Sequence, residues 1–337
     1  MIDKKITSKI LKEIKLSENI LLHLHPSPDP DSIGSALALQ EFLLSLDKKV
    51  TIIAGDSKDK NHLEIFPNVK SIKAKNIFET DLSKLDLFII LDSSEPSQIS
   101  KLGDSQKYIA NIKKIVIDHH PTNKNFGDLN LVLPKHTSTA EILFDLFNLW
   151  KVKITTNMAI CLFLGIYSDT GGFSNLNTTP QSIYKCSILA KNINNLPRVM
   201  FEFRNNSSAQ ELKFIKLGLV NNNILFNNKV AISAITLKDL KKNNLDVESI
   251  NKVQLSETLR KCKDWQITIA MVETKSNYNT LSMRSRNEKY DLTKIAKRFS
   301  GGGHKVAAGA LIEASPKEAL KQLIAAIHKC FPELGEP

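Results

Sequence analysis

Acidic and histidine side chains gather in four short motifs in the first half of the chain. The first motif, HPSPDPDSIGS, starts at His25 and contains Asp29 and Asp31 within seven residues. The other motifs are IILDSSEPS, IVIDHHPTN and IYSDTGGF, and they contribute Asp92, Asp118, His119, His120 and Asp169. Two histidines and four aspartates suit two divalent ions, with Mn²⁺ favoured by the mixed ligands and Mg²⁺ or Co²⁺ as options. Two ions about 3.5–4 Å apart can activate a water molecule and stabilise a phosphoryl group.

The first motif has two readings, because prolines alternate with its acids over residues 26–31. The prolines favour an extended chain, in which Asp29 and Asp31 face the same way and can converge. A helix would then open at Gly34 and Ser35, with first-turn amides that favour phosphate. The alternative is a proline-rich loop in which the aspartates serve as helix caps.

The other motifs differ in how strongly they indicate chemistry. Asp92 follows an apolar run of strand length, where an aspartate is often only a helix cap. Two adjacent histidines, His119 and His120, are unusual for packing alone. Asp169 comes at the end of a predicted helix, where the helix dipole disfavours an acid unless a cation compensates.

A basic segment in the second half could hold a phosphate. Between Arg260 and Lys305 there are eleven Lys and Arg residues against four Asp and Glu, so +7 of the net charge of +11 lies there. This segment contains SMRSR (282–286) and RFSGGGHKVAAGA (298–310). Arginine has a planar fork of donors that matches phosphate oxygens, and a glycine turn can expose backbone amides. The alternative for the glycines is a flexible turn.

Continuous apolar runs of strand length cover 19–25, 49–55, 85–92 and 113–120, and three of the four lead into a motif. Helical patterns at 35–46, 138–150, 156–168 and 180–193 follow or alternate with them. Continuous runs are typical of strands buried on both faces, and the alternation predicts a doubly wound, mainly parallel α/β sheet. The motifs would then lie at the carboxyl ends of the strands, where such sheets bind ligands.

The second half predicts a smaller α/β domain. Its strand candidates are 230–236, 265–273, 279–284 and 306–312, and its helix candidates are 291–299 and 316–329. Residues 193–213 are polar and rich in asparagine, and they predict a linker with short helical pieces. The expected organisation is therefore a catalytic domain over 1–192, this linker, and a substrate-binding domain over 214–332.

Composition narrows the class of protein. Hydrophobic residues make up 42% of the 337 residues and charged residues 24%, which is typical of globular domains. The four cysteines form no C-x-x-C pair, the first residues lack a signal-peptide pattern, and no run has the length of a membrane span. We therefore expect a cytoplasmic protein without membrane contact. The pI of about 9.3 suits anionic partners, although a lysine-rich composition explains it equally well.

These motifs, taken together, resemble the DHH phosphoesterases, which are named for the sequence that stands here as Asp118, His119 and His120. The similarity runs from about His23 to Ala310, and it is strongest to the bacterial oligoribonuclease and pAp-phosphatase branch, which has a DHH domain followed by a DHH-associated domain. In that family the segments around 282–286 and 298–310 look like the substrate-binding signature of the second domain.

The resemblance implies a role for each candidate residue. The implied metal ligands are His25, Asp29, Asp31, Asp92, His119 and Asp169, with Asp92 bridging two ions. His120 would contact the scissile phosphate, and Asp118 would orient a ligand histidine from behind. The implied substrate-binding residues are Arg284, Arg286, Gly301, Gly302, Gly303 and His304. Asn123 is a further candidate for substrate contact, although a loop asparagine is as often a turn residue.

The resemblance also implies a substrate class. We expect a two-metal phosphodiesterase that hydrolyses short oligonucleotides or dinucleotides, such as nanoRNA and pApA, to 5′ mononucleotides, and that can dephosphorylate pAp. The alternative within the family is a cyclic di-AMP phosphodiesterase. The alternative from another class is an inactive nucleotide-binding sensor. It is disfavoured because all six expected metal-ligand positions carry a histidine or an aspartate. A general RNA-binding protein would need exposed aromatic platforms, whereas aromatic residues are 7% of the chain and lie mostly in apolar runs. The oligomeric state stays open, with a homodimer as one option.

Overall fold

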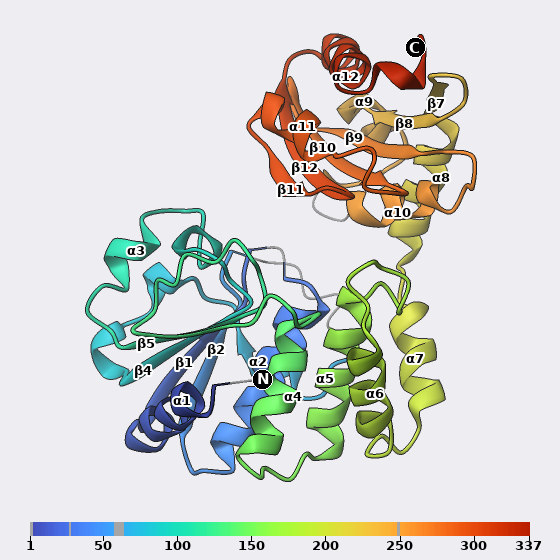
Figure 1. The fold of residues 1–337 in the computed structure, drawn as a ribbon. Helices are drawn as coiled ribbons and strands as arrows, with labels where there is room; N and C mark the ends of the chain where they lie inside the picture. The colour runs from blue at the N-terminus through green and yellow to red at the C-terminus, as the bar shows by residue number, and fades with distance from the viewer. Residues whose placement is uncertain (1–2, 27, 57–63, 248–249) are drawn as a thin grey trace. The chain divides into compact units, whose positions relative to one another are not determined.

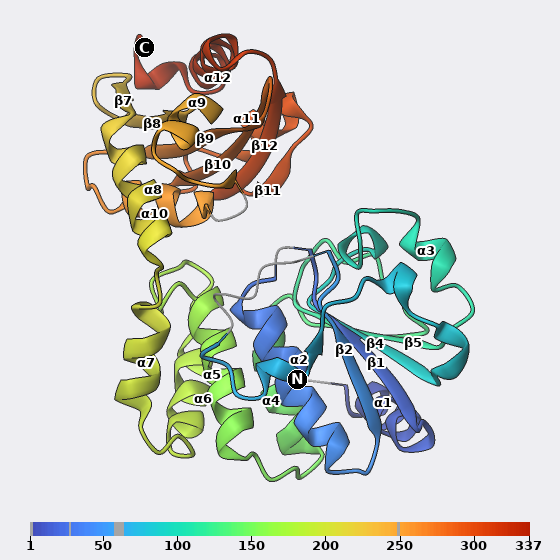
Figure 2. The ribbon, with the colours of Figure 1, turned by 180° about the vertical axis from the view of Figure 1, so that it is seen from behind.

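The computed structural model describes residues 3–26, 28–56, 64–247 and 250–337. It divides into two compact units, Met1–Asn206 and Ser207–Pro337, which Figures 1 and 2 show from two opposite sides. The division falls inside the segment 193–213, which contains helix α7 (Leu196–Arg204) and the start of helix α8 (Ala209–Val220).

Unit 1 is built on a six-stranded sheet in the order β3-β2-β1-β4-β5-β6, in which every neighbouring pair is parallel. The strands are β1 (Asn19–His23), β2 (Lys49–Ile53), β3 (Ile72–Lys73), β4 (Leu87–Leu91), β5 (Lys114–Asp118) and β6 (Leu129–Val132). The predicted doubly wound parallel sheet is thereby confirmed. The winding reverses between β1 and β4, and the crevice outside the carboxyl ends of these strands is where such sheets bind ligands.

Helices and turns cover both faces of this sheet. The helices are α1 (Lys4–Leu16), α2 (Pro30–Leu44), α3 (Ser105–Tyr108), α4 (Thr139–Leu149), α5 (Thr156–Asp169) and α6 (Pro180–Ala190). Short 3₁₀ turns span Val69–Ser71, Ile77–Glu79, Leu82–Lys84 and Pro96–Gln98. On one face Leu22 and Ile89 pack with the larger core formed by α1, α2, α4 and α5, and on the other Leu21 and Phe88 pack under α3 and the turns. Neighbouring residues of a strand thus serve opposite cores, which explains the continuous apolar runs.

Two glycines allow helices α2 and α5, which lie side by side in Figure 2, to pack closely together. A Cβ atom at Gly34 would lie 2.3 Å from the carbonyl oxygen of Cys161. A Cβ atom at Gly165 would lie 2.7 Å from the Cβ of Ala140 and 3.0 Å from Oδ1 of Asp31. The contact at Gly165 brings the helix that ends in Asp169 against the start of α2 and the start of α4.

Unit 2 is a second α/β unit on a mixed sheet in the order β11-β12-β10-β9-β8-β7, in which only β8 and β9 pair in parallel. The strands are β7 (Asn222–Leu225), β8 (Val230–Ile235), β9 (Ile267–Lys275), β10 (Tyr278–Ser285), β11 (Gly302–His304) and β12 (Ala307–Glu313). Besides α8, the helices are α9 (Leu237–Lys242), α10 (Lys252–Arg260), α11 (Thr293–Ala296) and α12 (Pro316–Cys330), with 3₁₀ turns at Lys297–Phe299 and Pro332–Leu334.

Unit 2 also has a core on each face of its sheet. Met271 and Met283 face α11 and α12, while Ala270 and Val272 face α8, α9 and α10. In the described residues of both units, no helix is long and apolar enough to cross a membrane.

Candidate metal centre

The acidic and histidine motifs meet at the carboxyl edge of the sheet in unit 1. Strands β1, β4 and β5 are neighbours there. His25 follows β1, Asp92 follows β4 directly, and Asp118 is the last residue of β5. Because parallel strands end at the same edge, motifs that are far apart in sequence become neighbours in space.

One group of potential ligands consists of His25, Asp29 and Asp92. The ligand atoms of these three side chains lie within 4.8 Å of one another. Nε2 of His25 is 3.4 Å from Oδ2 of Asp92 and 3.6 Å from Oδ2 of Asp29. The other ring nitrogen of His25 contacts the carbonyl oxygen of Pro26 at 3.1 Å, which leaves Nε2 to face the carboxylates.

A second group consists of Asp31, His119 and Asp169, again with ligand atoms within 4.8 Å of one another. Nε2 of His119 is 3.3 Å from Oδ2 of Asp169 and 3.4 Å from Oδ1 of Asp92. Asp92 therefore stands between the two groups, with Oδ2 toward His25 and Oδ1 toward His119. Its backbone has a left-handed φ of 52°.

The first motif corrects the extended-chain prediction. Helix α2 begins at Pro30, one turn before Ser35, so Asp31 lies in the first turn of a helix and not in an extended segment. Asp29 is the helix cap, and its Oδ1 accepts hydrogen bonds from the backbone N–H groups of Asp31 and Ser32, each at 3.0 Å. Those first-turn amides are therefore occupied by Asp29, and the prediction that the amides of a helix opening at Gly34 face a phosphate is wrong. Asp29 is a cap and, through Oδ2, also faces His25.

Burial and mutual charge shift the pKa values of this cluster. Burial, together with the neighbouring charge of Asp92, raises the pKa of Asp31 to about 7. Burial opposes a charge on His119, but the carboxylates of Asp92 and Asp169 outweigh it and raise its pKa to about 10. The pKa of Asp92 lies well below its usual range, because His119 and His25 outweigh the effect of burial.

The donor set fits divalent ions. Nε2 of His119 is buried and has no hydrogen-bond partner among the described residues, although two carboxylates lie within 3.4 Å of it. A buried polar atom without a hydrogen bond carries a desolvation cost, which coordination of a cation would remove. Imidazole nitrogens and carboxylate oxygens together suit Mn²⁺ and related ions.

Asp118 is fully buried, and its carboxylate contacts the ring of His120 and not the ring of His119, the histidine that was predicted to be a metal ligand. Its Oδ1 is 2.7 Å from Nδ1 of His120 and accepts the backbone N–H of His119 at 2.8 Å. Asp118 thus orients the ring of His120. Burial opposes protonation of His120, but this contact outweighs it and raises the pKa of the ring. Nδ2 of Asn123 donates to Oδ2 of Asp118 at 2.7 Å and to the carbonyl oxygen of Ser93 at 3.0 Å. The side chain of Asn123 therefore supports Asp118, and its predicted contact with substrate stays a prediction.

The two arginines predicted to bind substrate have partners within unit 2. Nε of Arg284 is 2.6 Å from Oε1 of Glu257, and Nη1 of Arg286 donates to the carbonyl oxygens of Arg260 and Cys262 at 2.8 and 3.0 Å. Arg286 thus covers the end of helix α10. Each guanidinium has further N–H groups, so these contacts do not exhaust its capacity to bind phosphate.

His304 shares one row of the sheet with Arg284. Arg284 pairs with Ala307 across β10 and β12, and Ala307 pairs with His304 across β12 and β11. Directly paired residues of antiparallel strands point to the same face. The small side chain of Ala307 therefore lies between the positions of the arginine and the histidine.

The three glycines of the GGGH motif have different surroundings. A Cβ atom at Gly301 would lie 2.2 Å from the carbonyl oxygen of Gly309, and one at Gly303, where φ is +136°, would lie 2.5 Å from that of Ala307. A Cβ atom at Gly302 would meet nothing within 4 Å. Gly301 and Gly303 are thus required by the backbone itself, and only Gly302 borders open space.

Sequence reasoning missed Thr139, which contacts two of the predicted ligands. Its backbone N–H donates to Oδ2 of Asp31 at 2.7 Å, and its hydroxyl donates to Oδ1 of Asp92 at 3.3 Å. The available signal was the segment Ser138–Glu141, a serine followed three residues later by glutamate, which is typical of a helix start. It marks the start of α4 but does not indicate what the helix faces.

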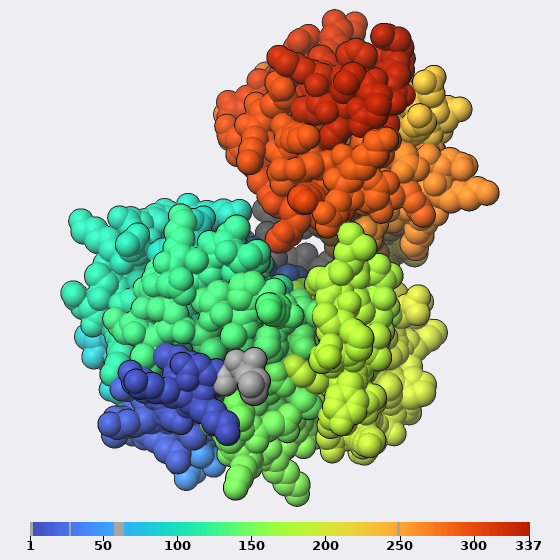
Figure 3. All heavy atoms as spheres, in the orientation of Figure 1, coloured from blue at the N-terminus to red at the C-terminus, as the bar shows by residue number. Residues whose placement is uncertain are grey.

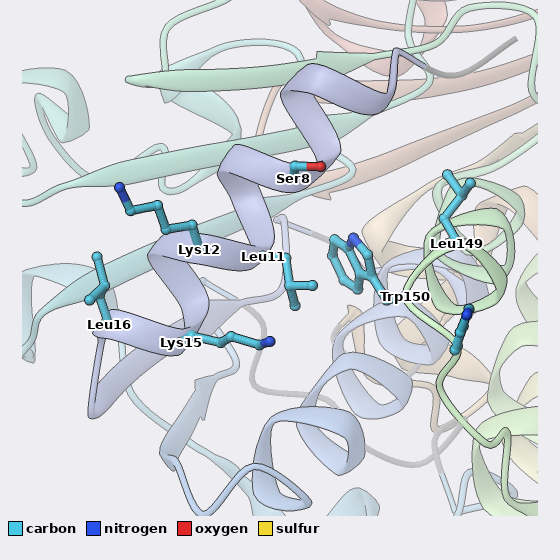
Figure 4. A pocket seen from close by; sticks show the side chains of 8 residues that line it. Ser8, Leu11, Lys12, Lys15, Leu16, Leu149 and Trp150 are labelled. Atoms are coloured by element: carbon cyan, nitrogen blue, oxygen red, sulfur yellow. The ribbon is translucent and has the colours of Figure 1, made fainter.

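A cavity of about 440 Å³ lies away from these residues, between α1 and the end of α4 (Figure 4). The surface of unit 1 shows α1 at this side as a dark blue ridge (Figure 3). The side chains that line the cavity are Ser8, Leu11, Lys12, Lys15, Leu16, Leu149, Trp150 and Lys151. None of them is acidic, so this cavity is not a second cation site.

Both halves of the chain are similar to known protein domains. Residues 19–166 match the DHH family, N-terminal domain, and residues 227–333 match the DHHA1 domain. The chain is 29% identical over 310 residues to a probable bifunctional oligoribonuclease and PAP phosphatase NrnA of Streptococcus mutans, covering 89% of this chain and 92% of that protein. It is 27% identical over 309 residues to the bifunctional oligoribonuclease and PAP phosphatase NrnA of Bacillus subtilis, covering 90% and 93%.

A solved structure shares the fold over nearly the whole chain. It is that of an exopolyphosphatase-related protein from Bacteroides fragilis, with a TM-score of 0.89, 24% sequence identity, and coverage of 99% of this chain and 98% of that one. With both domains matched, and with relatives aligned over about nine-tenths of its length, this chain belongs to the DHH family of metal-dependent phosphoesterases.

Proposed function

We propose that this protein is a two-metal phosphodiesterase that hydrolyses short oligonucleotides and dinucleotides such as pApA to 5′ mononucleotides, and that also removes phosphate from pAp. The observation that supports this most directly is the division of the ligands into two groups on either side of Asp92. Asp92 forms one group with His25 and Asp29, and its other oxygen faces His119 of the group Asp31, His119 and Asp169. A third, overlapping group joins Asp92 and His119 to Asp118 and His120. The substrate class is supported by the names of the relatives from S. mutans and B. subtilis.

The proposed ligands are His25, Asp29, Asp92, Asp31, His119 and Asp169, with Mn²⁺ as the expected ion. Two bound ions would supply positive charge to the phosphoryl group and lower the pKa of an attacking water. His120 is proposed to donate a hydrogen bond from Nε2 to a phosphate oxygen, because Asp118 holds Nδ1 at 2.7 Å and favours the protonated ring. Asp118 and Asn123 keep that ring in place.

In unit 2 we propose that His304, Arg284 and the open position at Gly302 bind a second phosphate or the terminal nucleotide. The support is the shared row of Arg284 and His304 and the absence of any atom within 4 Å of a Cβ at Gly302. Arg286 follows β10 by one residue, within the basic segment from Arg260 to Lys305. A homodimer stays a prediction, to be checked by light scattering.

The test compares substrates and metals on one preparation. Metal-stripped protein is assayed with added Mn²⁺, Mg²⁺ or Co²⁺ against pApA, cyclic di-AMP, pAp and RNA oligomers of two to twenty nucleotides. The proposal expects no turnover without metal, highest kcat/KM on the shortest oligomers and pApA, and phosphate release from pAp. Highest kcat/KM on cyclic di-AMP would move the function to the alternative within the family, and binding of these ligands without turnover would support an inactive sensor.

Two variants test the assignment of the histidines. His119→Ala should lose bound Mn²⁺, because it removes a proposed ligand, whereas His120→Ala should keep Mn²⁺ and lose turnover. Metal content is measured by elemental analysis beside kcat. Equal loss of metal in both variants would show that His120 is a ligand and not a phosphate donor.

A further inference from the structure

The first turn of helix α4 reaches into the candidate metal centre through Thr139 and the backbone amide of Ala140. The side chain of Thr139 is fully buried. The backbone N–H groups of Thr139 and Ala140 donate to Oδ2 and Oδ1 of Asp31 at 2.7 and 2.8 Å, and the hydroxyl of Thr139 donates to Oδ1 of Asp92 at 3.3 Å. Thr139 is thus in contact with a member of each side of the centre, although it has no ligand atom of its own in either group.

The amide contacts fix the position of Asp31 without using up its capacity as a ligand. A carboxylate has about four lone-pair sites, and here each oxygen accepts one amide hydrogen. Ser35 adds a contact at 3.3 Å to Oδ1. Asp31 also lies at the N-terminal end of the eleven-residue helix α4, where the helix dipole favours an ionised carboxylate. The amides of the first turn of α4 therefore fix the orientation of the Asp31 carboxylate.

The hydroxyl contact fixes the rotation of Asp92. The terminal torsion of an aspartate is broad, so burial alone does not decide which oxygen faces which neighbour. Here Oδ1, which accepts the hydroxyl of Thr139, faces His119 at 3.4 Å, and Oδ2 faces His25 at 3.4 Å. Among the described residues, Thr139 has the only side-chain hydroxyl that donates to Asp92. Without it, no hydroxyl would hold the Asp92 carboxylate in this rotation.

The segment that carries Thr139 is itself held by a buried network. Glu141, 3% exposed, accepts hydrogen bonds from the backbone N–H and the hydroxyl of Thr137 at 2.7 and 2.8 Å. Lys185 of α6 donates to the other oxygen of Glu141 at 2.8 Å. Ser138 caps α4 through the N–H of Glu141. The loop before α4 therefore has little freedom to shift relative to the ligands.

We propose that Thr139 is a positioning residue of the metal centre: its amide holds Asp31, and its hydroxyl orients Asp92 so that one oxygen faces each side. This inference rests on the proposed two-metal function. A residue behind a ligand that orients it typically changes metal affinity or activity by about 10–100-fold when lost.

The experiment removes the hydroxyl and keeps the shape. Thr139→Val has nearly the same volume and retains the backbone amide, while Thr139→Ser restores a hydroxyl. The control is Thr7→Val, which removes another buried threonine hydroxyl of unit 1, one that donates to the carbonyl oxygen of Lys4 at 3.0 Å in helix α1. Mn²⁺ binding to each metal-stripped protein is measured by calorimetry, with kcat and KM for pApA at saturating Mn²⁺.

We expect the dissociation constant for Mn²⁺ to rise about 10–100-fold in Thr139→Val, to stay within about 3-fold of wild type in Thr139→Ser, and to be unchanged in Thr7→Val. At saturating Mn²⁺, the Val variant should lower kcat and leave KM within about 2-fold, because the ligand orientation and not the substrate contact has changed. Circular dichroism in EDTA verifies the fold, and Thr139→Ala replaces the Val variant if that one does not fold.

Two results would overturn the inference while the proposed function stands: wild-type affinity for Mn²⁺ in the Val or Ala variant, or a Ser variant as weak as the Val variant. Wild-type protein that binds no Mn²⁺ would overturn the proposed function and this inference with it.

Discussion

At Asp92 the backbone restricts which substitutions are informative. The residue has a φ of 52°, a left-handed conformation that aspartate and asparagine tolerate better than most residues. Replacement by alanine would combine loss of the carboxylate with backbone strain of about 1–2 kcal/mol. Asparagine removes the charge and keeps the conformation, so it separates the two effects.

We expect Asp92→Asn to fold normally but to lose most bound Mn²⁺ and to lower kcat on pApA by more than about 100-fold. The reason is that the two oxygens of Asp92 face His25 and His119, one in each ligand group. Thermal unfolding, metal content and turnover are compared with those of Asp47→Asn, a control at another left-handed position with a φ of 56°. Turnover close to wild type in Asp92→Asn, with metal present in excess, would contradict a bridging role.

Residue types revealed most of the candidate site but not its connections. The eight acidic and histidine residues of the four motifs were recognisable because imidazoles and carboxylates are rare together after apolar strands. Thr139 was not, because its contact with Asp31 spans 108 positions of sequence and a threonine at a helix start normally indicates only a cap. The capping role of Asp29 was open in sequence, because the same prolines suit an extended segment and the first turn of a helix.

Helices α4 and α6 are joined by a buried charge network that should make stability depend on pH. Asp145 lies 2.9 Å from Nε2 of His136 and 2.7 Å from Nζ of Lys185. Burial alone would raise the pKa of Asp145, but His136 and Lys185 outweigh it and lower that pKa. A lowered carboxyl pKa stabilises the fold above its ordinary value of about 4, and this stabilisation is lost as pH falls through the lowered value.

We therefore expect Asp145→Asn to reduce the free energy of unfolding at pH 7 by about 1 kcal/mol, a low figure for charged hydrogen bonds because part of the side chain is exposed. The difference from wild type should shrink below about pH 4. Denaturant unfolding at several pH values measures both, beside Asp81→Asn, which alters an exposed pair with Lys84 and should change little. A difference that is the same at pH 3 and pH 7 would argue against the charge network.

Gly301, just before strand β11, and Gly302 within it provide a prediction about a single segment. Gly301→Ala should destabilise unit 2 by about 1–3 kcal/mol, because its Cβ would overlap the carbonyl oxygen of Gly309. Gly302→Ala should leave the unfolding temperature unchanged, because open space surrounds the position, and should raise KM for pApA if a phosphate approaches there. Thermal unfolding and steady-state kinetics decide this, and a Gly301→Ala protein as stable as wild type would contradict the packing argument.

Long apolar elements were predictable, whereas short or polar ones were not. The predicted strands at 85–92 and 113–120 correspond to β4 and β5, because each contains a run of buried apolar residues, five in β4 and the three from Ile115 to Ile117 in β5. Strand β11 has three exposed residues, two of them glycine, and strand β7 has no fully buried residue. Their pairing is decided by the neighbouring strands, which the local sequence does not reveal.

Each unit has its own pair of cores, and this sets an expectation for the whole molecule. The cores of unit 1 and of unit 2 share no buried residue, so each unit should unfold as a cooperative body. Calorimetry of metal-stripped protein should therefore show two transitions. Mn²⁺ at about 100 times its dissociation constant adds about 2.7 kcal/mol, which raises one transition by roughly 5–10 °C and leaves the other in place. In Asp92→Asn the shift should vanish. If Mn²⁺ raised both transition temperatures equally, metal binding would not be confined to unit 1.

Strand β11 is also an edge strand of the sheet in unit 2, and this has a consequence for solubility. An edge strand exposes unpaired backbone N–H and C=O groups, and a strand of another polypeptide can pair with them. Such pairing is a common start of aggregation. Strand β11 is only three residues long, and Gly303 departs from regular strand geometry with a φ of +136°. Such a short and irregular ladder gives an approaching chain little to pair with. The features that leave Gly302 bordering open space therefore also disfavour the addition of another strand at this edge of the sheet.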